Sequence, residues 1–273
     1  MVAFWPGEKE PEDNGHKLSL LLDAIDDHGE ATLAVRRIGT NALPFLLRWI
    51  SKERSPARQR MIWIAEKLHV PIRGFALGIA LDDDNRRRGE RGFGMLGPIA
   101  TPALPELARL LSRTNSLTSG AAARALAAIG KEGIPALLDS FNDKGNLNRP
   151  IVAYYLVFAY RNAGQIEVGL PTVKRMLDDQ DARVVRNVVV ALTNLTLEPD
   201  HSVPLLAELT QHSNVTVRYV SVSGLEKFGL NSRSAVPRLV ERLEDSDSTV
   251  RETATNALQK IAPEVLTNGV KGF

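Results

Sequence analysis

The sequence contains no cysteine among its 273 residues. The chain therefore forms no disulfide bond, and it uses neither a catalytic thiolate nor a cysteine-ligated zinc or iron–sulfur centre. Long apolar runs are missing as well. The longest stretch without Asp, Glu, Lys or Arg is Gly92–Pro105, which glycines and prolines interrupt. A bilayer span takes about 20 apolar residues, so we expect no membrane span in this chain.

The sequence signatures of common enzymes are also missing. It has no HExxH motif, no GxSxG motif, no Walker loop and no dinucleotide-binding GxGxxG motif. The run Asp82–Arg88 lacks the alternating ligands of a calcium loop. Five histidines are scattered along the chain: His16, His28, His69, His201 and His212. We therefore expect no metal, no cofactor and no enzymatic activity.

Charge is unevenly distributed along the chain, although the net charge is only +2. Residues 1–30 carry 8 acidic and 2 basic groups, whereas residues 31–130 carry 16 basic and 7 acidic groups, a net charge of +9. A basic surface of this kind attracts polyanions. The simpler interpretation is that these arginines are solvated on exposed helix faces, since arginine favours helices.

A short motif repeats along the sequence: a small or apolar residue, then a proline, then an apolar segment. The last three of its prolines are 33 residues apart. The six prolines that carry the motif are Pro44, Pro105, Pro135, Pro171, Pro204 and Pro237. A period of this length is typical of helical repeat proteins.

Each repeat predicts two helices, which we call A and B. Proline favours the first turn of a helix, where its missing N–H group would have no partner, and it therefore marks the start of helix A. Helix B follows a polar turn, and its apolar residues recur with the period of one helix face, as in Val184, Val188, Ala191, Leu192 and Leu195. No stretch alternates long enough to predict a sheet. A single pair cannot bury its apolar face but a stack can, so the sequence predicts an all-α fold.

The units resemble HEAT repeats, in particular the short bacterial type called PBS-lyase HEAT-like repeats. The resemblance rests on Asp181, Asn214 and Asp247, each ten residues after the proline, and on the pairs Val217–Arg218 and Val250–Arg251. It implies a right-handed α-solenoid of about seven to eight helix pairs, related to armadillo arrays. It also implies that the aspartates and arginines of the motif tie successive units together and are structural.

The resemblance and the composition together predict the domain organisation. Residues 1–15 are rich in Pro, Gly and Glu, and we expect a disordered acidic leader there. Residues 16–273 are expected to form one solenoid, with a capping helix pair at 16–40 and a fragment of a cap at 263–273.

The cellular location stays open, because many bacterial proteins of this type carry an N-terminal membrane anchor. The expected location is the cytoplasm for a complete chain, and the membrane or the exterior for a truncated one. Nothing in the sequence demands a dimer, and we expect a monomer.

The B helices are expected to line the concave surface, where solenoids usually bind their partners. Positions 15 and 19 after each proline lie opposite the buried stripe. Aromatic and arginine side chains, which are enriched at binding hot spots, occur there: Trp63, Arg124, Tyr154, Arg186 and Tyr219. In the alternative interpretation, Trp63 and Tyr154 pack between helices.

Two functional hypotheses follow. The first is a non-enzymatic scaffold that binds a protein or peptide on the concave surface. The alternative is binding of nucleic acid, or another polyanion, through the basic segment 31–130. Its candidate residues are Arg48, Lys52, Arg54, Arg60, Arg86, Arg87, Arg88 and Arg91, of which the last four are expected on a B helix that follows an inter-helix turn at Asp82–Asn85.

Overall fold

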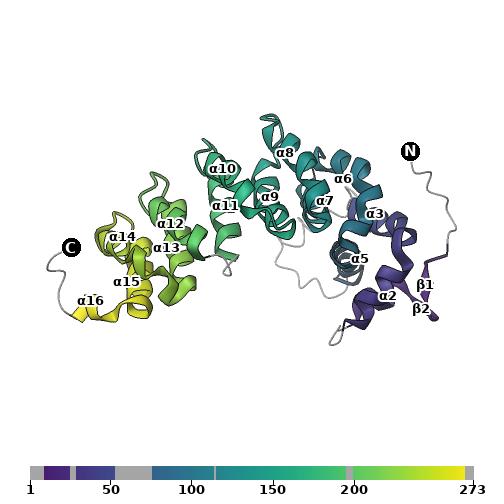
Figure 1. The fold of residues 1–273 in the computed structure, drawn as a ribbon, viewed down its shortest axis with the longest axis horizontal. Coiled ribbons are helices and arrows are strands. Elements are labelled where there is room, and N and C mark those ends of the chain that lie inside the picture. Colours follow the sequence, from purple (N-terminus) through teal and green to yellow (C-terminus); the bar gives the residue numbers. More distant parts are fainter. Residues whose placement is uncertain (1–8, 25–28, 53–75, 114, 195–198, 268–273) are drawn as a thin grey trace. The chain divides into compact units, whose positions relative to one another are not determined.

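The computed structural model describes residues 9–24, 29–52, 76–113, 115–194 and 199–267 (Figure 1). The chain divides into two compact units, residues 1–165 and residues 166–273, which we call the N-terminal unit and the C-terminal unit. Each unit consists of packed helix pairs, and the prediction of an all-α solenoid is confirmed. Within the described ranges, no helix is long and apolar enough to cross a membrane.

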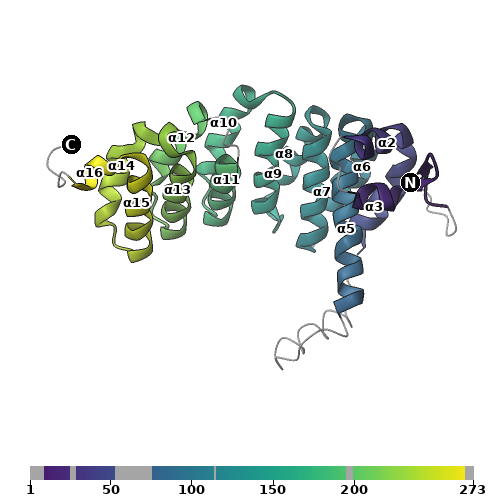
Figure 2. The same ribbon diagram turned by 90° about the horizontal axis from the view of Figure 1, so that it is seen from below.

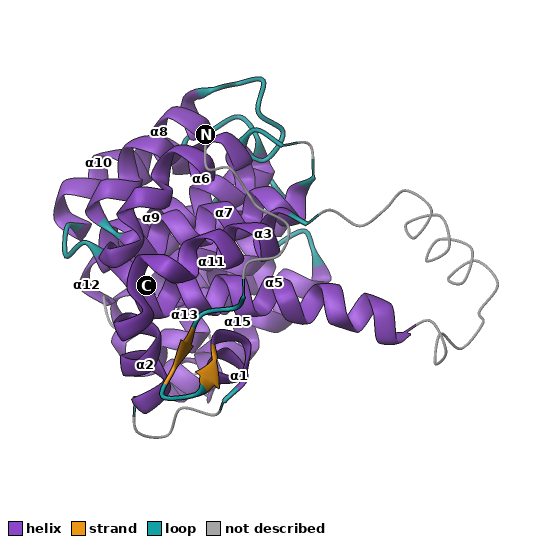
Figure 3. Cartoon of the chain, turned by 90° about the vertical axis from the view of Figure 1, so that its right-hand side faces the viewer, coloured by secondary structure: helices purple, strands orange, loops and turns teal. Residues whose placement is uncertain are grey.

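The N-terminal unit begins with a small antiparallel pair of strands, β1 (Glu12–Asp13) and β2 (His16–Lys17). The strands lie against α1 (Leu18–Asp23) and α2 (Glu30–Ile38), which occupy the span of the expected capping pair (Figure 3). Part of the leader that we expected to be disordered, residues 9–15, thus contributes a strand and a turn. The helices that follow are α3 (Leu43–Ser51), α5 (Ala76–Leu96), α6 (Leu104–Leu111), α7 (Ser116–Ile129), α8 (Ile134–Asn142) and α9 (Arg149–Asn162).

In its described residues, the C-terminal unit contains three helix pairs and a terminal helix. Its helices are α10 (Ile166–Leu177), α11 (Ala182–Asn194), α12 (Pro199–Leu209), α13 (Val215–Phe228), α14 (Val236–Glu241), α15 (Ser248–Ile261) and α16 (Pro263–Thr267), with a 3-10 turn, η6 (Arg242–Glu244), after α14. The B helices α11, α13 and α15 lie side by side (Figure 2).

The repeated prolines mark the A helices, as predicted. In four repeats the proline stands in the first turn of its helix: Pro44, Pro105, Pro135 and Pro237. A 3-10 segment precedes each of these helices: η1 (Gly39–Ala42), η3 (Gly97–Ala103), η4 (Lys131–Gly133) and η5 (Gly229–Ala235). Pro171 and Pro204 differ, because the preceding segment is α-helical there and the proline lies inside α10 or α12.

The predicted apolar stripe of the B helices is buried. In α15 it consists of Val250, Ala254, Ala257, Leu258 and Ile261. The stripe of α13 contains Ser221 and Gly224 in the same register, and both are buried. Small side chains at the centre of each stripe allow neighbouring helices to approach closely.

Polar side chains fix the start of several B helices. Asn115, Asn214 and Asp247 each accept hydrogen bonds from backbone amides in the first turn of α7, α13 and α15, respectively. Such N-caps pair amides that the helix itself leaves without partners. At the other end of α7, Gly130 adopts a φ of 85°, which favours glycine and ends the helix.

The expectation of an inter-helix turn at Asp82–Asn85 is wrong, because these residues lie inside the continuous helix α5. Aspartates followed by arginines three or four residues later favour a helix through side-chain pairs. Arg87 Nη1 lies 3.8 Å from Asp84 Oδ1, and Arg86 Nε lies 3.9 Å from Glu90 Oε1. The same run therefore supports the helix that we expected it to interrupt.

Candidate functional site

The B helices of the N-terminal unit, α5, α7 and α9, lie side by side (Figure 2). An ion pair links the first two: Arg124 Nη1 of α7 donates to Glu90 Oε2 of α5 at 2.8 Å. The Arg124 side chain is 55% exposed, whereas Glu90 is 18% exposed. We use the name N-terminal B-face for the surface formed by Glu90, Arg124, Tyr154, Tyr155 and Phe158. Its exposed guanidinium group is held by a carboxylate and is open to a partner.

Three aromatic side chains cluster on α9 beside this ion pair. The ring centroids of Tyr154 and Tyr155 lie 5.0 Å apart at 88°, and those of Tyr154 and Phe158 lie 5.0 Å apart at 35°. All three side chains are half-buried. Burial raises the pKa of the Tyr155 hydroxyl, whereas the charge of Arg124 opposes that rise and the charge of Glu90 adds to it. These two charged groups and three rings therefore form one local group.

The structure places the predicted wall residues of this unit as follows. Arg124 is exposed, as predicted for position 19. Tyr154 is half-buried against Tyr155 and Phe158. Trp63 lies outside the described residues. The sequence did not predict Tyr155, because this residue comes directly after position 19 of its repeat, the position that was predicted to be exposed.

In the C-terminal unit, Arg186 of α11 and Tyr219 of α13 occupy the same position of successive B helices. Both are exposed, Tyr219 to 38%. Arg186 Nη2 donates to Asn187 Oδ1 at 3.1 Å. Glu252 of α15 occupies this position in the next helix and is exposed as well. A row of one cation, one ring and one anion thus runs across α11, α13 and α15.

Two of the basic candidates hold the N-terminal cap in place. Arg88 of α5 pairs with Asp23, its Nε donating to Oδ1 at 2.8 Å. Arg91 donates from Nη1 to Leu22 O and from Nη2 to Ala24 O, both at 2.8 Å. The two arginines therefore cover the end of α1, where carbonyl groups lack helical partners. Both arginines thus stabilise the attachment of α1 to α5.

The other basic candidates are more open. Arg87 is 77% exposed. Arg48 of α3 is exposed, with its Cζ 4.9 Å from the centroid of the Phe45 ring, and Lys52 is exposed just after that helix. Arg86 is half-buried beside Glu90. Arg54 and Arg60 lie outside the described residues.

The arginines assigned a structural role by resemblance do bridge chain segments. Arg218 donates to both carboxylate oxygens of Asp245, at 2.8 and 2.9 Å, and so ties α13 to the turn before α15. Arg251 donates to the carbonyl oxygens of Asp245 and Ser246. The acid of this bridge is Asp245, whereas Asp247 caps α15.

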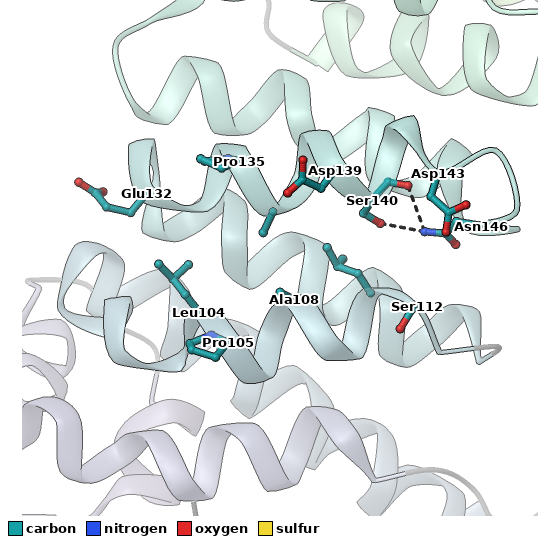
Figure 4. A pocket seen from close by; sticks show the side chains of 12 residues that line it. Leu104, Pro105, Ala108, Ser112, Glu132, Pro135, Asp139, Ser140, Asp143 and Asn146 are labelled. Atoms are coloured by element: carbon teal, nitrogen blue, oxygen red, sulfur yellow. Dashed lines mark hydrogen bonds between the residues drawn. The ribbon is translucent and has the colours of Figure 1, made fainter. Parts of the chain in front are cut away.

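A groove that the sequence did not predict lies between the A helices α6 and α8. Its volume is about 470 Å³. Leu104, Pro105, Ala108, Leu111 and Ser112 form the α6 wall, while Glu132, Pro135, Ala136, Asp139, Ser140, Asp143 and Asn146 form the α8 wall (Figure 4). The only signal in the sequence is the pair of small residues Ala108 and Ala136, which leave space between the helices.

The described parts of the chain contain no cluster of three His, Asp or Glu side chains able to hold a metal ion. His201 Nε2 lies 2.8 Å from Glu167 Oε1, a single contact at the surface of α10 and α12.

Two family models match this sequence. The model described as HEAT repeats matches residues 202–268, and the model described as PBS lyase HEAT-like repeat matches residues 120–143. No curated protein matches the chain.

Several solved structures resemble the fold at low sequence identity. A chain of the complex of CpcE and CpcF of phycocyanin lyase from Nostoc sp. PCC7120 is 21% identical and aligns over 57% of this chain and 98% of its own length, with a TM-score of 0.46. An engineered protein is 18% identical over 90% of this chain and 96% of its own length, with a TM-score of 0.43. A computationally designed armadillo repeat protein for modular peptide recognition is 16% identical over 89% and 98%, with a TM-score of 0.42.

Proposed function

We propose that this chain, which is a HEAT-repeat protein, acts as a non-enzymatic scaffold that binds a protein or peptide partner on the face formed by its B helices. One observation carries the proposal: the exposed Arg124 pairs with the half-buried carboxylate of Glu90, beside a cluster of three aromatic rings. Arginine and tyrosine dominate binding energy at many interfaces. The packed helices beneath hold these side chains in place and reduce the entropy lost on binding.

The chemistry of the N-terminal B-face indicates what kind of partner it suits. Tyr154, Tyr155 and Phe158 are half-buried, so they offer ring edges and faces without large conformational freedom. Arg124 can donate to a carboxylate or carbonyl group while it retains its bond to Glu90. The surface therefore suits a partner segment that combines an apolar or aromatic side chain with a hydrogen-bond acceptor.

A selection of displayed peptides against the full chain tests the proposal. Peptides enriched on the unmodified protein should bind Arg124→Glu at least about tenfold more weakly, because the change reverses the charge beside the aromatic cluster. Arg109→Glu is the matched control. Arg109 is 56% exposed and also pairs with a glutamate, Glu106, but it lies on the A helix α6.

The control variant should bind the enriched peptides with unchanged affinity. If the peptides bind all three proteins equally, the partner surface lies elsewhere and the proposal fails. Circular dichroism of each variant checks that the helices are intact.

Polyanion binding remains the second candidate, and what supports it is the exposure of Arg48, Lys52 and Arg87. Its weakness is that Arg88 and Arg91 already bond to α1. Fluorescence anisotropy with duplex DNA and single-stranded RNA, at low and physiological salt, tests it in the double variant Arg48→Glu/Arg87→Glu. Affinity that persists at physiological salt and collapses in the variant would favour this function.

A further inference from the structure

The groove between α6 and α8 has two chemically different walls. The α6 wall presents Leu104, Ala108 and Leu111, whereas the α8 wall carries the carboxylates of Glu132, Asp139 and Asp143 (Figure 4). No lysine or arginine lines the groove. Among the described residues, these three acids take part in no ion pair. One side of the groove therefore favours apolar side chains and the other favours cations.

The end of the groove near Asp143 is held firmly by hydrogen bonds. Asn146 Nδ2 donates to Ser140 Oγ at 2.8 Å, which fixes the loop after α8 (Figure 4). Asn148 Nδ2 donates to Arg113 O at 2.7 Å and ties the same loop to the turn after α6. Leu147, between these two asparagines, is 79% exposed. A preformed loop at this end of the groove lowers the ordering cost of binding there.

The length of the groove suits a short segment of chain. Leu104 to Ser112 spans roughly 12 Å along α6 at 1.5 Å per residue. An extended chain covers that length in about four residues, and its side chains alternate between two faces. An extended segment can therefore present different side chains to the two walls of the groove.

The spacing of the carboxylates matches such a segment. Asp139 lies on α8, and Asp143, four positions later, is the residue that caps the end of this helix; positions four apart on a helix have Cβ atoms about 6 Å apart. Residues two apart in an extended chain are separated by about 6.6 Å. Alternate basic side chains can therefore meet these two acids while the intervening apolar side chains face α6.

We propose that the α6–α8 groove is a second docking site, which takes an extended segment of a partner protein in which lysine or arginine alternates with apolar residues. The site goes beyond the proposed function, because it uses A helices and shares no residue with the N-terminal B-face. Charge complementarity selects the partner, since the α8 wall is acidic and the groove has no cation of its own.

A fluorescent hexapeptide of alternating leucine and lysine tests the site on the full chain at physiological ionic strength. The peptide should bind the unmodified protein, and Asp139→Asn/Asp143→Asn should weaken binding at least about tenfold. Asp143 Oδ1 accepts a hydrogen bond from the backbone N–H of Gly145. The Asp143→Asn change keeps this oxygen, so the loop should stay in place. Asp178→Asn/Asp200→Asn is the matched control, because it removes two exposed carboxylates outside the groove.

The control double variant should bind as tightly as the unmodified protein, and so should Arg124→Glu, which alters only the B-face. Ala108→Trp, which fills the groove and leaves its charges, should abolish binding, and a hexapeptide of alternating leucine and glutamate should not bind. Equal affinity for both double variants would overturn the proposal, and so would full binding by Ala108→Trp. Sedimentation of the chain as a dimer that Ala108→Trp dissociates would identify a second copy as the occupant and would also overturn it.

Discussion

At the scale of single residues, Asp245 of the C-terminal unit is buried and accepts several hydrogen bonds. Its side chain is 1% exposed and accepts hydrogen bonds from Arg218, from Arg242 and from the amide of Asp247. The guanidinium group of Arg218, followed by the amide and Arg242, lowers the pKa of Asp245 to about 2. The carboxylate form is therefore strongly preferred in the folded chain.

The depressed pKa makes the stability of this unit sensitive to acid. The pKa of Asp245 in the folded chain lies below its unfolded value near 3.8. The ionised side chain therefore adds about 2 kcal/mol to the free energy of unfolding above pH 4. The contribution is lost as the pH falls from about 4 to about 2. Urea denaturation at pH 7 and at pH 3 should show Asp245→Asn less stable than the unmodified chain at pH 7, with a smaller difference at pH 3.

Glu244→Gln is the control for this prediction, since Glu244 is the neighbouring acid and is exposed. It should leave stability unchanged at both pH values. A constant difference between Asp245→Asn and the unmodified chain across this range would contradict the proposed ionic role.

The resemblance to HEAT repeats implied the arginines of this bridge, Arg218 and Arg251, but it assigned the acid to Asp247. Asp247 stands ten residues after Pro237, whereas Asp245 lies two residues earlier in the same turn. Which one caps the helix and which one accepts from Arg218 depends on the path of the turn, which the spacing of residues does not determine.

At the scale of helices, Gly224 lies where α13 packs closely against its neighbours. A Cβ atom there would lie 2.6 Å from Thr193 Oγ1 and 3.1 Å from Leu206 Cδ1. Thr193 has little room to move, because its hydroxyl donates to Val189 O at 2.8 Å. Gly224→Ala should therefore destabilise the C-terminal unit by about 1–3 kcal/mol, although alanine favours helices.

Gly120 of α7 is the contrasting case. Its added Cβ would lie 3.5 Å from Ile151 Cγ1, an ordinary contact. Gly120→Ala should therefore stabilise the N-terminal unit by about 0.5–1 kcal/mol. Urea denaturation followed by circular dichroism measures both changes, and destabilisation by Gly120→Ala would contradict the packing described for α7 and α9.

The attachment of α1 to α5 gives a second prediction at this scale. Arg91→Ala removes both hydrogen bonds to the end of α1, and the amides of α1 should then exchange with deuterium about tenfold faster. Arg87→Ala changes an arginine on the same helix that makes no contact with α1 in the described structure. Similar exchange in both variants would show that Arg91 does not hold the cap.

Most helices could be predicted from the sequence because the proline and the apolar stripe recur with a fixed register. Helix α5 is the main failure, since its run of aspartates and arginines suits a turn as well as a helix. Pairing between residues three or four apart, together with burial of Phe93 and Leu96 beneath them, favours the helix. Such packing is a tertiary effect that local spacing does not reveal.

At the scale of the whole molecule, helical phase in the sequence predicted which side chains of the B helices are exposed, but it did not predict the groove between A helices. The exposed positions of Arg124, Arg186 and Tyr219 follow from helical phase alone. The α6–α8 groove depends on how two A helices from successive repeats pack, and Ala108 and Ala136 gave only a weak signal for it. The N-terminal unit therefore carries two chemically distinct surfaces, an arginine–aromatic B-face and an acidic groove.

Site-specific photo-cross-linking tests the central claim, partner binding on the B-face, most directly. Benzoylphenylalanine is placed at Phe158, within the aromatic cluster of α9, and at Leu230, which is 68% exposed in η5, as the control. We predict that the Phe158 probe forms one discrete protein adduct in extracts of the source organism, and that Arg124→Glu abolishes it while Arg109→Glu does not. Adducts that form equally from both probe positions, or that survive Arg124→Glu, would contradict a partner site on the B-face.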